Sequence, residues 1–137
     1  MSYVVKAAVS DAKAKLFAFH QQKTMYGGKN IAVKDEIFVF ASENEGGCGL
    51  IARGVVTCAE RPPRKSNPKV RETPRVSITV RRVALAKRSL GRTELKPFRN
   101  WEDGRPETEL CFKLYRQATN KVAGITAGTA AFLRKRF

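Results

Sequence analysis

The strongest constraint on the fold is a series of short apolar runs separated by segments rich in glycine, proline and charge. DEIFVFAS (35–42) is a continuous apolar run, ENEGGCG (43–49) interrupts it with three glycines, and LIARGVVTCAE (50–60) resumes it. Two such runs with a glycine-containing connection are typical of an antiparallel strand pair. Gly54 inside the second run indicates a bulge or a close backbone approach.

Other segments with strand character lie on both sides of this pair. We predict strands over SYVVKAAV (2–9), VSITVRRVALA (76–86), LCFKLYRQ (110–117) and KVAGI (121–125). Leu110, Phe112 and Leu114 fall on one face of the segment 110–117. The segment 87–109 is irregular, with a helical turn.

Two helices are predicted, one near each end of the chain. In DAKAKLFAFHQQK (11–23) the spacing of Ala12, Leu16 and Phe19 fits an amphipathic helix that ends before Gly27. Thr126 is a suitable N-cap for a final helix over AGTAAFLRKRF (127–137).

The segment RPPRKSNPKVRETPR (61–75) is expected to be a loop, because it holds four prolines and is mostly polar and basic. Two interpretations stay open: a solvated linker, or a mobile arm that lies along phosphates. No internal repeat or domain boundary is visible. The pattern predicts a single domain, 1–137, of the α+β class, with a small β-barrel of five to six strands and flanking helices. A barrel removes exposed sheet edges and leaves its loops free to bind.

The charge of the chain indicates its partner. The net charge is +15 and the sequence pI about 10.3, which attracts polyanions. Nucleic acid, DNA or RNA, is the first partner to consider, because Lys and Arg neutralise phosphates and release counterions. An anionic membrane surface and a purely solubilising charge are the alternatives. No apolar segment approaches the ~20 residues of a membrane helix. The oligomeric state is not predicted.

The residues typical of metal sites and enzymes are sparse. Cys48, Cys58 and Cys111 form no C-x-x-C pair and are expected to be reduced thiols in a cytoplasmic protein. With His20 as the only histidine, neither a metal site nor a cofactor is expected. No G-x-S-x-G or P-loop motif is present, so we predict a binding protein rather than an enzyme.

Three loops carry candidate binding residues. In TMYGGKN (24–30), Tyr26 offers a stacking ring, Gly27 and Gly28 a closely approachable backbone, and Lys29 a charge for phosphate. The alternative is a helix C-cap followed by a turn, with one glycine in the left-handed conformation.

The second loop, PFRNWEDG (97–104), contains the only tryptophan. Trp101 either stacks on a base or plugs the end of a barrel, and Phe98 is a second ring. In the third loop, YRQATNK (115–121), the donors and amides of Arg116, Gln117 and Asn120 suit base edges. Solvent-exposed strand polarity is the alternative there.

The order of these segments resembles the EVE domain family of the PUA-like superfamily. The resemblance rests on SYVVKAAV, on DEIFVFASENEGGCGLIARGVVTCAERP and on LYRQATNKVAGIT before a closing helix, and it spans nearly the whole chain. It implies a module that recognises a modified base. Ser42, Glu43 and Asn44 would lie at the rim of its pocket, with Arg116 and Gln117 on the opposite wall.

The resemblance also implies that the segment with Tyr26 and its two glycines closes over the pocket. The family often has a Trp in the first strand and another in the segment that follows, whereas this chain has Tyr3-Val4-Val5 at the first of these places. Trp101 and Phe98 would supply rings instead. The alternatives are an RNA-binding PUA-like module without a base pocket, and a small nucleotide-acting enzyme that uses Glu43 or Glu45.

Overall fold

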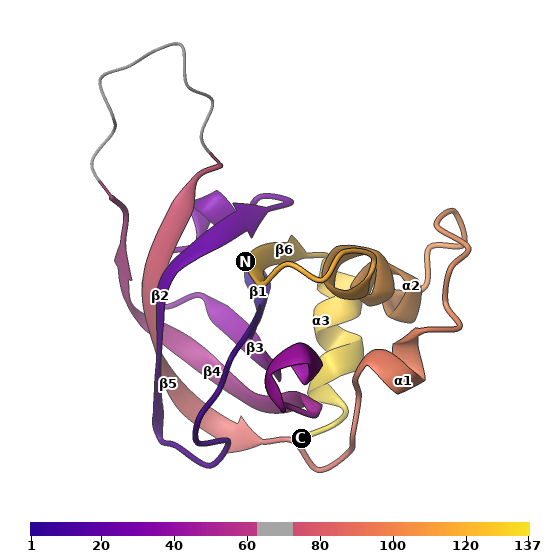
Figure 1. The fold of residues 1–137 in the computed structure, drawn as a ribbon, viewed down its shortest axis with the longest axis horizontal. Helices are drawn as coiled ribbons and strands as arrows, with labels where there is room; N and C mark the ends of the chain where they lie inside the picture. The colour runs from indigo at the N-terminus through magenta and orange to yellow at the C-terminus, as the bar shows by residue number, and fades with distance from the viewer. Residues whose placement is uncertain (63–72) are drawn as a thin grey trace.

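Six strands form a closed barrel in the order β1-β3-β4-β5-β2-β6 (Figure 1). The computed structural model describes residues 1–62 and 73–137. The strands are β1 (Ser2–Ala7), β2 (Leu16–Met25), β3 (Glu36–Ala41), β4 (Gly49–Glu60), β5 (Arg75–Leu85) and β6 (Lys121–Ile125). The α+β barrel with flanking helices predicted from the sequence is therefore confirmed. The strands expected at 2–9, 35–42, 50–60, 76–86 and 121–125 are present with small shifts in their bounds.

The helices gather on one side of the barrel (Figure 1). They are α1 (Arg92–Leu95), α2 (Pro106–Leu110), the π-helical turn η3 (Cys111–Tyr115) and α3 (Ala127–Arg134). Two short 3-10 turns, η1 (Gly28–Asn30) and η2 (Glu43–Glu45), lie in loops. In the described parts of the chain, no helix is long and apolar enough to cross a membrane.

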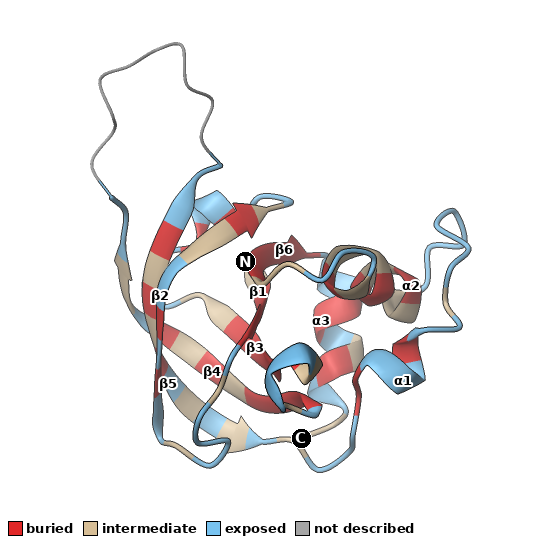
Figure 2. Ribbon diagram, viewed as in Figure 1, coloured by how far each residue is buried: buried red, intermediate tan, exposed pale blue. Residues whose placement is uncertain are grey.

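The buried residues of the strands, red in Figure 2, divide at alternate positions between two separate cores. In β1, Tyr3, Val5 and Ala7 join the cluster inside the barrel, whereas Val4 joins a second cluster on its outer face. The second cluster is completed by the helices, including Leu95, Leu110, Leu114, Ala130 and Leu133. Each fully buried aliphatic side chain contributes about 1.5–3 kcal/mol to stability. The strands that face the helices are therefore buried on both sides.

The predicted helix over 11–23 is wrong, since most of this segment forms β2. Phe17 and Phe19 are buried while Ala18 and His20 are exposed, which is the period-two pattern of a strand. β2 pairs with β5 over most of its length, and this pairing overrides the local helical spacing.

The predicted strand over 110–117 is also wrong. Pro106 stands in the first turn of α2, with Glu107 and Glu109 beside it, and these are helix-start signals. Leu110 and Leu114 are buried four residues apart, which fits one helix face rather than one strand face.

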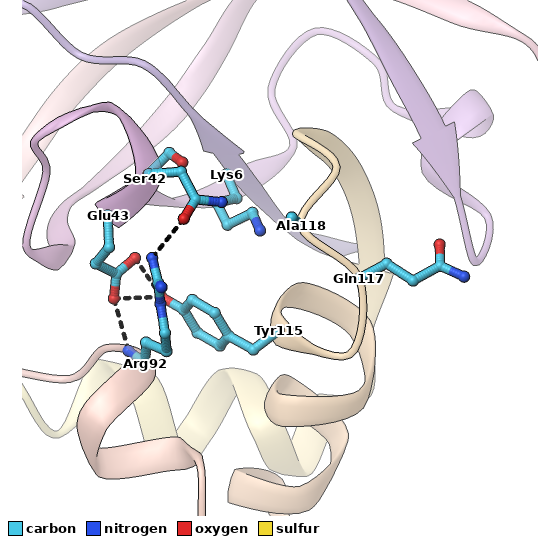
Figure 3. A pocket seen from close by; sticks show the side chains of 8 residues that line it. Lys6, Ser42, Glu43, Arg92, Tyr115, Gln117 and Ala118 are labelled. Atoms are coloured by element: carbon cyan, nitrogen blue, oxygen red, sulfur yellow. Dashed lines mark hydrogen bonds between the residues drawn. The ribbon is translucent and has the colours of Figure 1, made fainter.

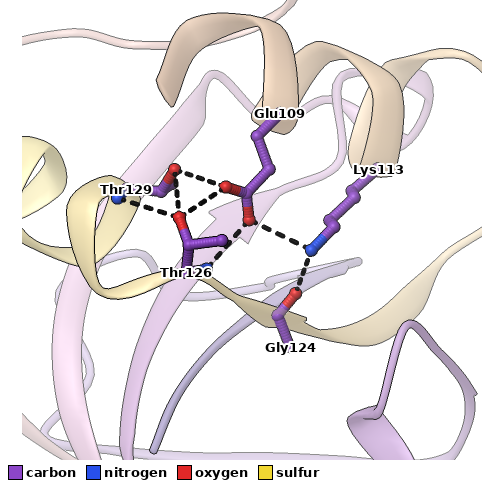
Figure 4. Close-up of polar contacts among 5 residues, drawn as sticks. All are labelled: Glu109, Lys113, Gly124, Thr126 and Thr129. Carbon is purple, nitrogen blue, oxygen red and sulfur yellow. Dashed lines mark hydrogen bonds and ion pairs between the residues drawn. The ribbon is translucent and has the colours of Figure 1, made fainter. Parts of the chain in front are cut away.

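The final helix is capped as predicted: the Thr126 hydroxyl accepts a hydrogen bond from the Thr129 amide at 3.3 Å. Glu109 reinforces this cap (Figure 4). Its carboxylate accepts hydrogen bonds from the Thr126 amide (3.0 Å), from the Thr126 hydroxyl and the Thr129 hydroxyl (2.7 Å each) and from Lys113 (3.0 Å). Lys113 also donates to the Gly124 carbonyl at 2.7 Å, so the cluster ties α2 and η3 to β6 and α3.

The predicted loop 61–75 lies mainly outside the described residues. At its edges, Arg61 donates hydrogen bonds to the carbonyls of Lys29 and Ile31, and the Pro74 carbonyl accepts from Thr24.

Candidate functional site

One pocket of about 120 Å³ lies between the end of β1, the turn η2 and the helical layer. Its lining is polar and comes from segments far apart in the sequence: Lys6, Ser42, Glu43, Asn44, Arg92, Tyr115, Gln117 and Ala118 (Figure 3). The end of β3 places Ser42 and Glu43 on one side, and the end of η3 places Tyr115 and Gln117 on the other.

Glu43 is held in one orientation by its neighbours (Figure 3). The Tyr115 hydroxyl lies 3.1 and 3.2 Å from its two carboxylate oxygens, and the backbone N–H of Arg92 donates to one of them at 2.6 Å. The Arg92 guanidinium donates to the Asn44 side-chain oxygen at 2.9 Å. Burial, and then the Glu43 carboxylate, raise the pKa of Tyr115 well above its ordinary value, so this hydroxyl stays a donor.

Other polar groups of the lining are available to a ligand. Within residues 1–62 and 73–137, neither the Ser42 hydroxyl nor the Gln117 amide has a side-chain hydrogen-bond partner, although Ser42 is buried. Gln117 borders the pocket, but its side chain extends away from Lys6, Ser42 and Glu43 (Figure 3). The Ser42 hydroxyl is therefore the uncommitted group that lies within the pocket wall.

A lysine forms part of the pocket's inner wall. Lys6 is buried, donates to the Leu114 carbonyl at 2.7 Å and lies 5.2 Å from the centroid of the Tyr115 ring. Burial lowers the pKa of Lys6, and the nearby Glu43 offsets part of this effect. The pocket thus combines an oriented carboxylate with a cation.

Beside the pocket lies an aromatic surface formed by Tyr26, Trp101 and Phe112. The Phe112 ring packs against Tyr26 (centroids 5.8 Å apart) and edge-on against Trp101 (5.2 Å). Arg116 lies over Phe112 at 4.1 Å, and its guanidinium is 3.4 Å from the Tyr26 hydroxyl. Trp101 is 43% exposed, so it lies on the surface and does not plug the barrel.

The structure brings the predicted site residues together in two groups. Ser42, Glu43, Asn44 and Gln117 line the pocket, and Asn120 stands nearby, where it donates to Glu45 at 3.2 Å. Tyr26, Trp101 and Arg116 belong to the aromatic surface and do not line the pocket.

The remaining predicted residues lie elsewhere. Gly27 is in the left-handed conformation (φ 83°), as the turn interpretation expected, although the segment before it is a strand and not a helix. Gly28 is buried, and a side chain there would meet the Val122 carbonyl, so it packs on β6. Lys29 is exposed and its carbonyl accepts from Arg61. Phe98 packs against the helix-side core.

Sequence reasoning missed Lys6, Arg92 and Tyr115. Lys6 had a detectable signal, because it is a cation inside the apolar run SYVVKAAV, where a strand buried on both faces would normally carry an apolar residue. Arg92 and Tyr115 had none, since they reach the pocket only through the packing of the helices. In the described part of the chain, no group of three or more His, Cys, Asp or Glu side chains is placed to hold a metal ion.

Comparison with known proteins identifies the fold. No protein-family model and no curated protein matches the sequence. Among solved structures, the DUF55 domain of human thymocyte nuclear protein 1 is similar at a TM-score of 0.63 with 16% identity, over 98% of this chain and 97% of that one.

Two further structures agree. Human THYN1 protein in complex with DNA containing 5-methylcytosine has a TM-score of 0.63 and 17% identity, over 98% of this chain and 95% of that one. A hypothetical protein from Leishmania major has a TM-score of 0.60 and 18% identity, over 98% of this chain and 92% of that one. The chain therefore has the fold of the EVE/PUA-like domains that its sequence resembles.

Proposed function

We propose that this chain is a nucleic-acid-binding module that receives one extruded, modified base in the pocket. The observation that carries the proposal is the oriented Glu43 carboxylate in an open, polar pocket the size of one ring. The pocket measures about 120 Å³, and an apolar cavity of about 150 Å³ is known to hold benzene. A base taken out of its stack costs a few kcal/mol, which contacts in such a pocket repay.

The lining favours a base with an exocyclic amino group. A carboxylate has about four acceptor positions, and Glu43 uses part of them for Tyr115 and the Arg92 amide. Its free capacity suits the amino group of cytosine or adenine, as acidic side chains accept from cytosine in DNA complexes. Ser42 adds a hydroxyl for another edge atom.

The positive charge of the chain supplies the part of the binding affinity that does not depend on the nucleotide sequence. A chain with a net charge of +15 binds phosphates through counterion release, so binding will weaken steeply with salt. The complex of human THYN1 with 5-methylcytosine-containing DNA, which has the same fold at 17% identity, supports a modified base and makes 5-methylcytosine the first to test.

The test is a binding titration at fixed salt with DNA and RNA oligonucleotides that carry cytosine, 5-methylcytosine, adenine or N6-methyladenine. We expect a preference for one modified base. Glu43→Gln should reduce this preference about tenfold, because a good base-edge contact is worth about 1–3 kcal/mol. Non-specific binding should persist.

Glu102→Gln is the matched control. It makes the same change in charge as Glu43→Gln, but Glu102 is exposed and does not line the pocket. Equal binding of all oligonucleotides would contradict a base pocket and favour an RNA-binding or purely cationic module. We propose a binding protein and not an enzyme, so no oligonucleotide or nucleotide should be chemically altered. Turnover that Glu43→Gln abolishes would reverse that part of the proposal.

A further inference from the structure

Two buried lysines stand directly opposite each other on neighbouring strands. Lys6 of β1 pairs with Lys121 of β6, and they are 2% and 1% exposed. Like charges in this arrangement destabilise a sheet, and burial disfavours their charged forms. The flanking residues on the same face, Val4 and Ala123, belong to the helix-side core. The fold gives Lys6 a partner in the Leu114 carbonyl, but it gives the Lys121 ammonium no hydrogen-bond partner among the described residues.

The charges around the pair are unbalanced. Lys6 lies in the field of Glu43 and Glu45 from η2, and of Arg92 from α1. The charged groups that act on Lys121 are both cations, Lys6 and Arg116. Neither lysine forms an ion pair with any acid of the described residues.

Donors on both lysines remain available. Lys6 uses one N–H for the Leu114 carbonyl, which leaves two of its three donors. The Lys121 ammonium has no hydrogen-bond partner within residues 1–62 and 73–137, and Lys121 is 1% exposed and lies behind Lys6 rather than in the pocket lining itself. In Figure 3 the Lys6 ammonium points away from Glu43 and toward Ala118.

We propose that Lys6 and Lys121 form an oxyanion subsite that binds a negatively charged group of the nucleotide whose base enters the pocket. This inference rests on the proposed function, and it adds the residues and the chemical group that fix the nucleotide. Side chains directly opposite on antiparallel strands have Cβ atoms about 4.5–5.5 Å apart, which allows two ammonium groups to share one oxyanion. Charge-assisted hydrogen bonds of this kind are about twice as strong as neutral ones.

Protonation gives the subsite a distinct pH dependence. Burial, with further contributions from Lys6 and Arg116, lowers the pKa of Lys121 to about 8. An oxyanion binds the protonated form, so its affinity should be full below pH 8 and fall as the pH rises above it. The decrease should be about tenfold per pH unit, because each unit removes nine-tenths of the remaining charged form.

The first experiment uses sulfate, which keeps its charge across this range, in a calorimetric titration at constant ionic strength. The wild-type chain should bind sulfate, and Lys121→Met and Lys6→Met should lose that binding. Lys135→Met is the matched control, since Lys135 is exposed at the end of α3 and away from the pocket. Sulfate binding that the Lys121→Met and Lys6→Met variants retain, or that does not change between pH 7 and 9.5, would overturn the subsite.

A stability measurement separates this role from a structural one. If the lysines serve binding, Lys121→Met removes a buried like-charge contact and should raise the melting temperature while it abolishes sulfate binding. A lysine needed for the fold would instead lower the melting temperature when replaced, and that result would contradict the proposal.

Modified oligonucleotides distinguish the two sources of the oxyanion. If the group is a phosphate, a methylphosphonate at the extruded nucleotide should weaken binding to the wild type and have little effect on Lys121→Met. If the group is an acidic substituent of the base, 5-carboxylcytosine should bind more tightly than 5-methylcytosine, and the methylphosphonate should have no effect.

Different experimental results would contradict the subsite and the proposed function. Absence of sulfate binding together with a retained modified-base preference would overturn the subsite alone. Lysine-dependent sulfate binding without any binding of nucleic acid would overturn the proposed function and leave an oxyanion site.

Discussion

The interior of the barrel and its helix-covered outer face are built from the same strands but differ in chemistry. The interior cluster consists of side chains such as Val5, Ile37 and Val39. On the outer face, apolar residues of β1 and β6 give way to Lys6 and Lys121, and the helices add the buried hydroxyls of Thr108 and Thr129. The difference indicates that the interior holds the sheet closed, while the outer face holds the polar groups of the candidate site.

The largest expected effects come from truncating one residue in each core. Ile37 and Leu114 are both fully buried, and replacing either by Ala should cost about 2–5 kcal/mol of unfolding free energy. Only Leu114→Ala should also weaken base preference, because Leu114 lies in η3 just before Tyr115 and its carbonyl accepts from Lys6. Chemical unfolding and oligonucleotide binding measure the two effects. An equal loss of preference in Ile37→Ala would remove the functional distinction between the cores.

A smaller effect is expected at Glu109, which joins the helices to the outer face. Burial alone would raise its pKa, but hydrogen bonds from Thr126, Thr129 and Lys113 outweigh burial and lower it. Glu109→Gln should cost about 1.5–3 kcal/mol at pH 7, the value of hydrogen bonds to a charged group.

The sign of the pH dependence checks this assignment. Because the folded-state pKa of Glu109 is lowered, its stabilisation is present above the ordinary carboxyl pKa of about 4.3 and is lost as the pH falls through the folded-state value. Denaturation of wild type and variant between pH 7 and 3 should therefore converge. A constant difference across this range would mean that the charge of Glu109 is not what stabilises the cap.

The charge of Lys121 should destabilise the fold, whereas the charge of Glu109 stabilises it. The pKa of Lys121 is lowered to about 8 in the fold, whereas an unfolded lysine titrates near 10.4. The unfolded state therefore binds more protons above pH 8, and stability should rise by about 1 kcal/mol per pH unit between pH 8 and 9.5. Lys121→Met should lack this rise in denaturation curves. The tyrosines Tyr3 and Tyr115, with raised pKa values, oppose the rise only above this window.

The smallest effect is expected at Trp101, which belongs to neither core. Because it is 43% exposed and packs edge-on against Phe112, Trp101→Ala should cost about 0.5–1.5 kcal/mol of stability. A loss of several kcal/mol on thermal unfolding would assign Trp101 to a core after all.

The sequence predicted the barrel well and the helical layer poorly. Runs such as DEIFVFAS are apolar on consecutive residues, short and bounded by turn residues, which is typical of a strand buried on both faces. The segment 11–23 was misassigned because Leu16 and Phe19 also fit a helical spacing, and only the pairing of β2 with β5 decides between the two. Periodicity does not register long-range pairing.

Four of the eight residues that line the pocket were predicted from the sequence. The resemblance to the EVE domain family placed Ser42, Glu43 and Asn44 at the rim of a pocket and Gln117 on its opposite wall, and the first three do follow a predicted strand. Arg116 is adjacent to Gln117, but the helical geometry of η3 turns it toward Tyr26 and away from the pocket. The local conformation of residues 110–117 decided which side chains entered the site, and that conformation was mispredicted.

The pairing of β2 with β6 closes the barrel with only two residue pairs, Thr24 with Val122 and Met25 with Ala123. The barrel should open most easily between β2 and β6, because few interstrand hydrogen bonds must break together there. β6 also carries Lys121, so a nucleotide bound at that lysine would stabilise the position of β6 beside β2. Amide hydrogens of Val122 and Gly124, which face β2, should then exchange with solvent faster than those of β3 in the free protein, and slow down on binding.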